Sequence, residues 1–138
     1  MLVCAECGKK NKIRPAERGS PHCGACGKPL PWLVNATDTT FAYEARSSVS
    51  ILVDLWAPWC GPCRVIGPML ENLSKEYAGR IKVVKDNVDE NPALAQQFGA
   101  TSIPTMIVIK GDRVVDRIVG ALPPNELKMR LFPYLMKT

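Results

Sequence analysis

The sequence predicts an α/β domain that follows a small N-terminal module, and three observations lead to this fold class. Residues 50–57 are apolar on both faces of a strand, as expected of a central strand covered on both sides. Segments with strand and helix patterns then alternate toward the C-terminus. Residues 1–28, by contrast, show no sustained apolar period, so burial alone cannot fold them. The 138 residues suffice for one domain and one small appendage.

The first part of the expected domain contains a linker, a short helix, a strand and a long helix. The prolines of residues 29–32 indicate a stiff linker that leaves the N-terminal module. Asp38 is expected to cap a short helix that ends at Ala45. The apolar strand over residues 50–57 follows. A helix is predicted over residues 60–77, because apolar side chains recur there at helical spacing.

Two prolines mark the middle of the chain. Pro68 lies inside the long helix, where its missing N–H group should produce a kink. A second strand is predicted over residues 80–88. Asn91 and Pro92 then supply the cap and the first turn of a helix that ends near residues 98–99.

The last part of the chain predicts a β-hairpin and a final helix. Strands over residues 105–110 and 113–119 flank a Gly-Asp pair that suits a tight turn. Pro124 opens an amphipathic helix, and Pro133 should kink or shorten this helix near its end.

Composition is typical of a soluble globular protein, with 46% apolar and 22% charged residues. The longest apolar stretch, residues 51–57, is far too short to cross a bilayer. The N-terminus shows no basic region followed by a long apolar core. We therefore expect no secretory signal and a cytoplasmic location, where cysteines more often bind metal or catalyse than form structural disulfides.

Positive charge is concentrated in the N-terminal module. Residues 1–34 carry six basic and two acidic side chains, whereas residues 35–138 carry 12 basic and 11 acidic ones. A basic face could attract an acidic partner or nucleic acid. Residues 1–28 contain no Phe, Tyr or Trp that could stack on bases, so nucleic-acid binding is not expected and a solvated basic face is the simpler interpretation.

The first four cysteines have the spacing of a zinc ribbon. Two C-x-x-C pairs stand 15 residues apart, and a glycine follows the second cysteine of each pair, where a tight turn needs an unhindered backbone. One structural zinc ion bound by four thiolates would supply the folding free energy of this segment. Surface disulfides, free thiols and an iron–sulfur cluster are the alternatives. His22 is interpreted as a bystander. The predicted ligands are Cys4, Cys7, Cys23 and Cys26.

The third C-x-x-C pair has a different setting. Cys60 lies where the apolar strand ends and the long helix begins, and unpaired N–H groups and the helix dipole stabilise a thiolate there. Cys63 shares a helix face with Cys60 and can close a small disulfide ring with it. Since no further pair remains to complete a four-thiolate site, a reversible dithiol is favoured over zinc here.

From about Val34 to the C-terminus the chain resembles the thioredoxin family. The motifs that carry the resemblance are Trp59-Cys60-Gly61-Pro62-Cys63, the preceding Val53-Asp54-Leu55-Trp56-Ala57, Pro68, Ile103-Pro104-Thr105 and Val119-Gly120-Ala121. The four-cysteine unit is similar to that of zinc-containing bacterial thioredoxins. The resemblance implies a thioredoxin fold, a central mixed sheet flanked by helices, over residues 31–138, with a zinc-ribbon-like module over residues 1–30.

The resemblance also implies a reaction, the reduction of protein disulfides. Cys60 would attack a disulfide of the substrate protein, and Cys63 would resolve the mixed disulfide. A thioredoxin reductase would then return electrons to the Cys60–Cys63 pair. No bound organic cofactor is expected, and the chain is expected to act as a monomer.

Asp54 is the most informative residue outside the cysteines. Its strand neighbours are apolar on both faces, so the carboxyl group should be buried and its pKa raised. The resemblance makes Asp54 the proton acceptor that helps Cys63 to ionise, through water, with Lys85 on the adjacent strand. The alternative is a structural acid that is satisfied by hydrogen bonds or by Lys85.

The resemblance further predicts the surface that receives the substrate. Pro104 would follow a cis peptide bond and face the dithiol, so that an extended substrate segment could pair with the backbone of Ile103. The residues expected to form this surface are Trp59, Gly61, Pro62, Ile103, Pro104, Gly120 and Ala121.

Two departures and three competing functions remain at this stage. Asp86 places a charge beside Lys85 and could disturb the pairing of Lys85 with Asp54, and Pro133 puts the last helical turn in question. An oxidant or isomerase is disfavoured by Gly61-Pro62. A binding module with a redox scaffold, and a sensor whose zinc thiolates are oxidised under stress, are the other two hypotheses.

Overall fold

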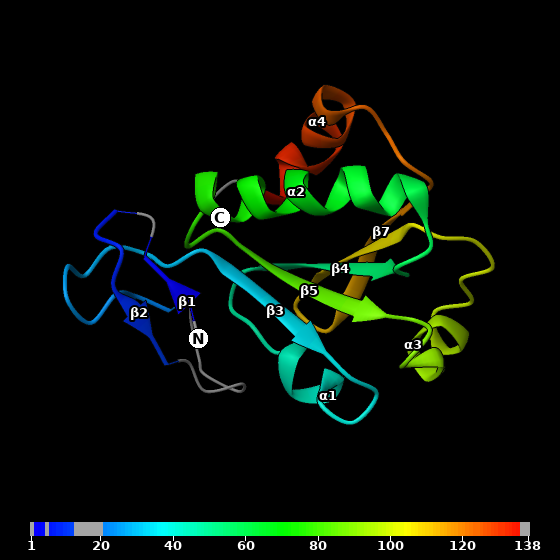
Figure 1. The fold of residues 1–138 in the computed structure, drawn as a ribbon, viewed down its shortest axis with the longest axis horizontal. Helices are drawn as coiled ribbons and strands as arrows, with labels where there is room; N and C mark the ends of the chain where they lie inside the picture. The colour runs from blue at the N-terminus through cyan, green and yellow to red at the C-terminus, as the bar shows by residue number, and fades with distance from the viewer. Residues whose placement is uncertain (1, 5, 13–20, 136–138) are drawn as a thin grey trace.

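A mixed five-stranded sheet forms the centre of the protein (Figure 1). The structure is a computed structural model that describes residues 2–4, 6–12 and 21–135. The strand order is β3-β5-β4-β6-β7; β3, β5 and β4 run parallel, while β6 and β7 are antiparallel to their neighbours. The strands are β3 (Trp32–Ala36), β4 (Ser50–Trp56), β5 (Ile81–Asn87), β6 (Thr105–Lys110) and β7 (Arg113–Val119).

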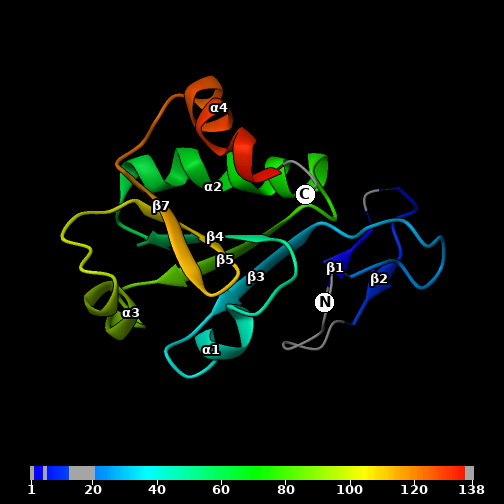
Figure 2. The same cartoon turned by 180° about the vertical axis from the view of Figure 1, so that it is seen from behind.

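Helices cover both faces of this sheet (Figure 1 and Figure 2). On one face, α2 and α4 pack on Leu52, Val83 and Met106. On the other, α1 and α3 pack on Val53, Val84 and Ile107. Burial on both sides explains why β4 is apolar almost throughout. The helices are α1 (Phe41–Glu44), α2 (Gly61–Glu76), α3 (Pro92–Gln97) and α4 (Pro124–Leu135).

The architecture confirms the expected mixed α/β fold and most of its predicted elements. The two hairpin strands, β6 and β7, have the predicted bounds. The long helix α2 contains Pro68. Helix α4 contains Pro133 and continues to Leu135, the last described residue, so this proline does not end the helix. Among the described residues, no helix is both long and apolar enough to cross a membrane.

The predicted linker is part of the packed structure. Trp32 begins β3 and is 1% exposed, and Leu30 before it is fully buried. The prolines suggested a stiff linker, and the structure shows in addition that Leu30 and Trp32 pack together in a cluster beside the sheet. The apolar side chains that adjoin the prolines therefore decide the structure of this segment.

The predicted cap of the first short helix was wrong, because Asp38 acts on a distant one. The Asp38 carboxylate accepts the N–H groups of Ala93 and Leu94, each at 3.3 Å, and so caps α3. Asn91 lies at the N-cap position of α3 as predicted, but its side chain makes no cap hydrogen bond. Instead, Asn91 Oδ1 accepts the Asp38 N–H group at 3.1 Å. The two residues thus cross-link two loops.

The N-terminal module consists of two similar loops beside β3 (Figure 1). Strands β1 (Leu2–Val3) and β2 (Lys10–Asn11) pair antiparallel around the first C-x-x-C pair. A bridge between His22 and Pro29 encloses the second pair in the same way. Buried side chains join the module to β3; they are Leu2, Cys4, Cys23, Leu30 and Trp32.

Trp32 also links this cluster to the sheet. The Lys82 ammonium lies 4.5 Å from the centroid of the Trp32 ring. Lys82 on β5 is fully buried and forms an ion pair with Glu44 of α1 at 3.1 Å. Trp32 therefore contacts both the buried side chains of the module and a buried charge of the domain.

Candidate active site and metal centre

A disulfide joins Cys60 and Cys63 at the start of α2, with their Cα atoms 5.3 Å apart. Cys60 is the N-cap residue of α2, where it has an extended backbone conformation, and its Sγ atom accepts the Cys63 N–H group at 3.2 Å. Both side chains are nearly buried, with 4% and 6% exposed. Because a helix N-terminus presents unpaired N–H groups and a positive dipole end, this position stabilises negative charge on Cys60 sulfur after reduction.

Exposed residues flank the disulfide on the solvent side. The Trp59 side chain is 67% exposed, and its Nε1 atom donates a hydrogen bond to Asp89 Oδ1 at 3.0 Å. Gly61 and Pro62 are exposed as well. Arg64 donates from its guanidinium group to the Pro58 carbonyl and so fixes the turn before the disulfide.

The Ile103-Pro104 segment lies against the disulfide, and its peptide bond is cis, as the resemblance implied. Ile103 packs on a small cluster that contains Ala57, Cys60 and Cys63. The Gly120 N–H group donates to the Pro104 carbonyl at 2.9 Å, which brings the loop after β7 to the same place. Ala121 follows in that loop and is exposed.

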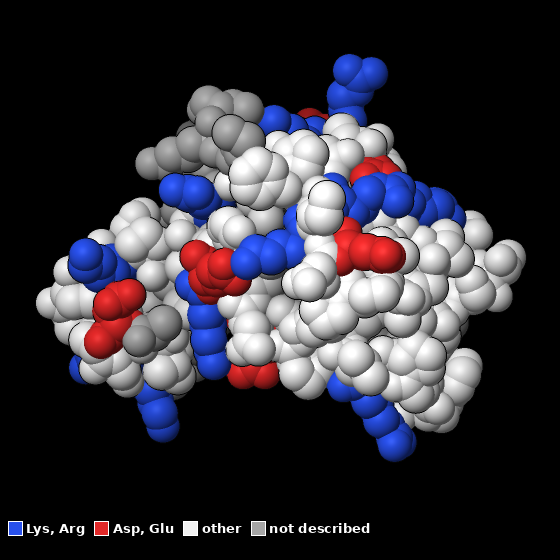
Figure 3. All heavy atoms as spheres, turned by 90° about the horizontal axis from the view of Figure 1, so that it is seen from above, with Lys and Arg blue, Asp and Glu red and all other residues white. Residues whose placement is uncertain are grey.

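The surface around the start of α2 carries few charges. Seen from above in Figure 3, the right-hand end of the molecule is mostly uncharged, and Lys, Arg, Asp and Glu gather over the middle and the left. This uncharged end is the end at which β4 stops and α2 begins in Figure 1.

Asp54 lies in β4, 2% exposed, on the sheet face that α2 covers. Its Oδ1 atom is buried without a hydrogen-bond partner among the described residues. Burial raises the pKa of the Asp54 carboxyl group to about 6, and the positive charge of Lys85 limits the rise. Asp54 can therefore exchange a proton near neutral pH.

Lys85 is the register partner of Asp54 on β5. The Lys85 ammonium lies 4.8 Å from the centroid of the Trp56 ring and makes no ion pair of 4.0 Å or less with Asp54. Lys85 and Cys63 both line an open cleft of about 340 Å³ beside the disulfide. Its other lining residues are Leu33, Trp56, Arg64, Gly67, Pro68 and Glu71.

The sequence raised the concern that Asp86 could disturb Lys85, but the two side chains lie on opposite faces of the sheet. The Asp86 register partners Ala36 and Leu55 belong to the core on the α1 and α3 side, so Asp86 faces away from Lys85. Asp86 is fully buried, and neither carboxyl oxygen has a hydrogen-bond partner among the described residues. Burial and the nearby charge of Asp38 raise the pKa of Asp86 to about 7.

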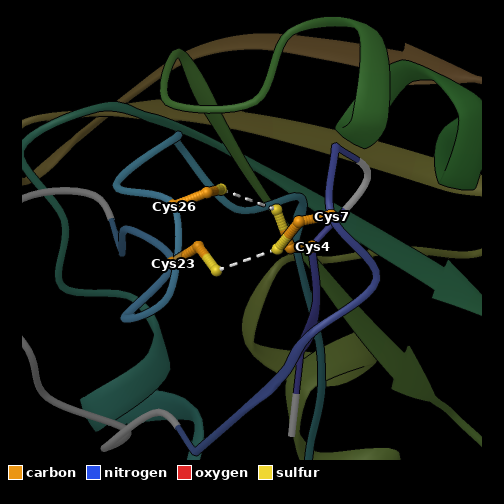
Figure 4. Close-up of side chains that lie close together, drawn as sticks. All are labelled: Cys4, Cys7, Cys23 and Cys26. Atoms are coloured by element: carbon orange, nitrogen blue, oxygen red, sulfur yellow. Dashed lines mark hydrogen bonds between the residues drawn. The ribbon is translucent and has the colours of Figure 1, made fainter.

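The four N-terminal cysteines converge from two loops, as Figure 4 shows. Their sulfur atoms all lie within 4.8 Å of one another, and this group does not include His22. The sulfurs of Cys4 and Cys26 are 3.6 Å apart, and those of Cys7 and Cys23 are 3.5 Å apart. These separations are too long for disulfide bonds, and all four cysteines are free.

This arrangement fits a tetrahedral metal ion. With zinc–sulfur bonds of about 2.3 Å, tetrahedral geometry places sulfur atoms about 3.8 Å apart. The backbone is preformed for this purpose, since Gly8 and Gly27 both adopt a φ of 76°, which side-chain-bearing residues rarely adopt. The four cysteines can therefore bind one metal ion.

Backbone N–H groups point at the sulfurs, but only two of the four thiols have a lowered pKa. The Cys7 N–H group lowers the pKa of Cys4, and the Cys26 N–H group lowers that of Cys23 to about 6, against a smaller opposing effect of burial. Against the N–H groups of Lys9 and Lys28, neighbouring sulfurs and burial raise the pKa of Cys7 to about 12 and also raise that of Cys26. The backbone hydrogen bonds also recur at equivalent positions of the two loops. The Cys4 N–H group donates to the Lys9 carbonyl, and the Cys23 N–H group donates to the Lys28 carbonyl. The two loops are thus structural repeats.

A disulfide at the N-terminus of a helix, a neighbouring cis-proline segment and a buried acid with a raised pKa define a protein that exchanges thiols and disulfides. Comparison with known proteins agrees. The family model for thioredoxin matches residues 32–132. The chain belongs to the thioredoxin family, whose members are protein-disulfide oxidoreductases.

Several thioredoxins resemble this chain over much of its length. "Thioredoxin 1" of Nostoc sp. is 50% identical over 100 residues, which span 72% of this chain and 94% of that protein. "Thioredoxin 2" of Chlorobaculum tepidum is 52% identical over 97 residues, 70% of this chain and 89% of that protein. The thioredoxin of Haemophilus influenzae is 54% identical over 82 residues, 59% of this chain and 77% of that protein.

Sequence reasoning missed two residues that support these sites. Asp89 holds the Trp59 indole, and its place after β5 gave no local signal. Asn11 contacts both cysteine loops, and only its position shortly after the first C-x-x-C pair could have drawn attention to it.

Proposed function

We propose that Cys60 attacks the disulfide of a substrate protein and that Cys63 resolves the product. Attack by the Cys60 thiolate forms a mixed disulfide and releases one substrate thiolate. Attack by the Cys63 thiolate on Cys60 sulfur then forms the Cys60–Cys63 disulfide and releases the second thiolate. Two electrons pass to the substrate, and its two thiolates take up protons. A thioredoxin reductase restores the dithiol.

The observation that carries this assignment is the place of Cys60 sulfur. It accepts the Cys63 N–H group at 3.2 Å at the N-cap of a 16-residue helix. The hydrogen bond from the Cys63 N–H group and the positive end of the helix dipole both favour the thiolate form of Cys60. Cys63 lies within the first turn of the helix, where it has a weaker claim to these effects. A thiolate that is favoured near neutral pH is the better nucleophile of the two.

We infer that Asp54 accepts the proton of Cys63 through water, and that Lys85 assists. The buried carboxyl group of Asp54 has a pKa of about 6, so at neutral pH the deprotonated form that can accept a proton is well populated. The cleft beside Cys63 and Lys85 gives water a route to this side of the dithiol. Lys85 would stabilise the Asp54 carboxylate between turnovers.

We propose one substrate-docking surface around the disulfide. Exposed and half-buried groups with little charge, together with the buried Pro104, surround the sulfurs there, and they come from three separate loops. An extended substrate segment would lie along Ile103 and bring its disulfide to Cys60. The residues of this surface are Trp59, Gly61, Pro62, Ile103, Pro104, Gly120 and Ala121.

We propose that the metal of the N-terminal module is a single zinc ion. Four thiolates in tetrahedral reach are the ligands that zinc prefers, and Cys4, Cys7, Cys23 and Cys26 would hold it. Bound zinc would supply structural cross-linking rather than reactivity. Residues 1–30 would then form the metal module and residues 31–138 the redox domain, a division supported by the match of the thioredoxin model from residue 32.

We further propose that the protein acts as a cytoplasmic monomer in electron transport and in maintaining cellular redox balance. The reducing cytoplasm keeps zinc thiolates and the dithiol reduced. The partners would be disulfide-containing substrate proteins and a thioredoxin reductase. Size-exclusion chromatography with light scattering tests the monomer, and a dimer mass would contradict it.

Insulin reduction by dithiothreitol, followed by turbidity, tests the roles of the two cysteines. Cys60→Ser should abolish the acceleration that the wild-type protein produces. Cys63→Ser should capture substrate proteins as stable mixed disulfides at Cys60. The exposed α4 residue Met129 offers a control, because Met129→Ser should retain wild-type reduction. Full activity of Cys60→Ser would show that the proposed nucleophile is wrong.

A further inference from the structure

The carboxamide of Asn11 lies between the two cysteine loops of the N-terminal module. We propose that Asn11 is a positioning residue of the metal centre, which clamps the loops together and donates a hydrogen bond to Cys23 sulfur. This inference rests on the proposed zinc site. Asn11 ends β2, and its side chain is half-buried.

Three hydrogen bonds define the clamp. Asn11 Nδ2 donates to the Lys9 carbonyl at 3.0 Å and to Cys23 Sγ at 3.6 Å. Asn11 Oδ1 accepts the Gly24 N–H group at 3.0 Å. The Gly24 N–H group can only donate, so the carbonyl oxygen must face it and the NH₂ group must face Lys9 and Cys23. The orientation of the amide is thus fixed by its partners.

The clamp breaks the symmetry of the two loops. Each loop repeats the same cysteine, glycine and lysine positions at a constant separation in the sequence, with the same backbone hydrogen bonds. In this repeat the counterpart of Asn11 is Leu30, which is fully buried against Trp32. Both loops pack on Trp32, the first through Leu2 and Cys4 and the second through Cys23 and Leu30. Asn11 adds a direct polar connection between the two loops.

The chemistry of the contact suits a metal thiolate. Cys23 sulfur already accepts the Ala25 N–H group at 3.4 Å, and Asn11 adds a side-chain donor. Donors around a bound thiolate disperse its negative charge and orient it toward the metal, and loss of such an outer contact typically weakens metal binding about 10- to 100-fold. Loss of the clamp would also remove the polar contacts that join the first loop to Cys23 and Gly24.

Two variants and one control separate the contributions in the full chain. Asn11→Ala removes all three hydrogen bonds. Asn11→Asp keeps an oxygen for Gly24 but replaces the NH₂ donor by a charged oxygen that faces the sulfur. Lys12→Ala is the control, because Lys12 is the exposed neighbour of Asn11.

Zinc affinity is measured by competition with a chromogenic chelator, and the thiolate environment by the sulfur-to-metal charge-transfer bands of Co²⁺-substituted protein. We expect Asn11→Ala and Asn11→Asp to bind zinc about 10- to 100-fold more weakly than wild type and to shift the Co²⁺ bands. Lys12→Ala should match wild type. If Asn11→Ala is isolated without metal, Co²⁺ titration of Asn11→Asp decides the question.

Zinc affinities of both variants within about twofold of wild type, with unchanged Co²⁺ bands, would overturn the proposed role of Asn11. Wild-type behaviour of Asn11→Asp alone would also overturn it, since the NH₂ donor would then contribute nothing. Wild-type protein that binds neither zinc nor Co²⁺ would instead refute the metal site itself, so the two failures are distinguishable.

Discussion

The most quantitative prediction concerns the buried carboxyl group of Asp54. In the folded protein its pKa is about 6, against an ordinary value of 3.8. The folded state therefore holds a proton between these two pH values that the unfolded chain has released. Raising the pH through this window destabilises the folded protein. Above about pH 6 the full penalty is present.

The penalty can be converted into a free energy because Asp54 is only 2% exposed. Moving a pKa from 3.8 to about 6 corresponds to about 3 kcal/mol, at about 1.36 kcal/mol per pKa unit. Asp54→Asn keeps the shape of the side chain but cannot ionise. We expect this variant to exceed wild type in unfolding free energy by about 3 kcal/mol at pH 8, with most of the difference gone at pH 4.

The assay is urea denaturation of the oxidised, zinc-supplemented proteins at pH 4, 6 and 8, followed by circular dichroism. Any change in metal binding with pH is common to both proteins and cancels in the difference. Equal pH dependence of wild type and Asp54→Asn would refute the reasoning, since it would mean that hydrogen bonds or Lys85 fully compensate the buried charge.

Three further predictions concern other parts of the molecule. Asp86→Asn should also stabilise the protein at pH 8 but not near pH 4, because burial raises the pKa of Asp86 to about 7. Urea denaturation at both pH values checks this, and a variant that is less stable than wild type at pH 8 would contradict it. Removal of metal by a chelator should expose Trp32 and shift tryptophan emission to longer wavelength. Trp32→Phe should lack that shift. The same shift in both proteins would contradict the prediction, because another tryptophan would then be its source. Asp38→Ala should lower the unfolding free energy by about 1 kcal/mol through loss of the α3 cap. Asp112→Ala, which changes an exposed turn residue, should lower it much less. Equal losses on urea denaturation would disprove the capping role.

Local pattern was sufficient to predict the parts of the fold in which one chemical preference dominates. The strand at β4 and the hairpin of β6 and β7 follow from apolar runs and a Gly-Asp turn, and the structure has them where expected. The helix after Cys60 follows from its apolar spacing. The separation of the six cysteines into a cluster of four and a bonded pair was likewise visible in their surroundings.

The features that were missed depend on contacts between distant segments. Asp38 caps α3 because the fold brings the two loops together, and no local pattern reports this. Leu30 and Trp32 were interpreted as a linker because they alternate with Pro29 and Pro31, although their side chains had apolar partners in the metal module. Asp86 could not be placed on a face until the register with Leu55 was known.

The central claim is that three C-x-x-C pairs perform two chemistries, and native mass spectrometry of one preparation tests it most directly. The reduced protein should contain one zinc ion. Oxidation by a disulfide substrate should remove two hydrogens while the zinc stays bound, and peptide mapping should find only the Cys60–Cys63 disulfide. Zinc bound at Cys60 and Cys63, or loss of zinc with disulfides among Cys4, Cys7, Cys23 and Cys26 in the normal redox cycle, would contradict the account.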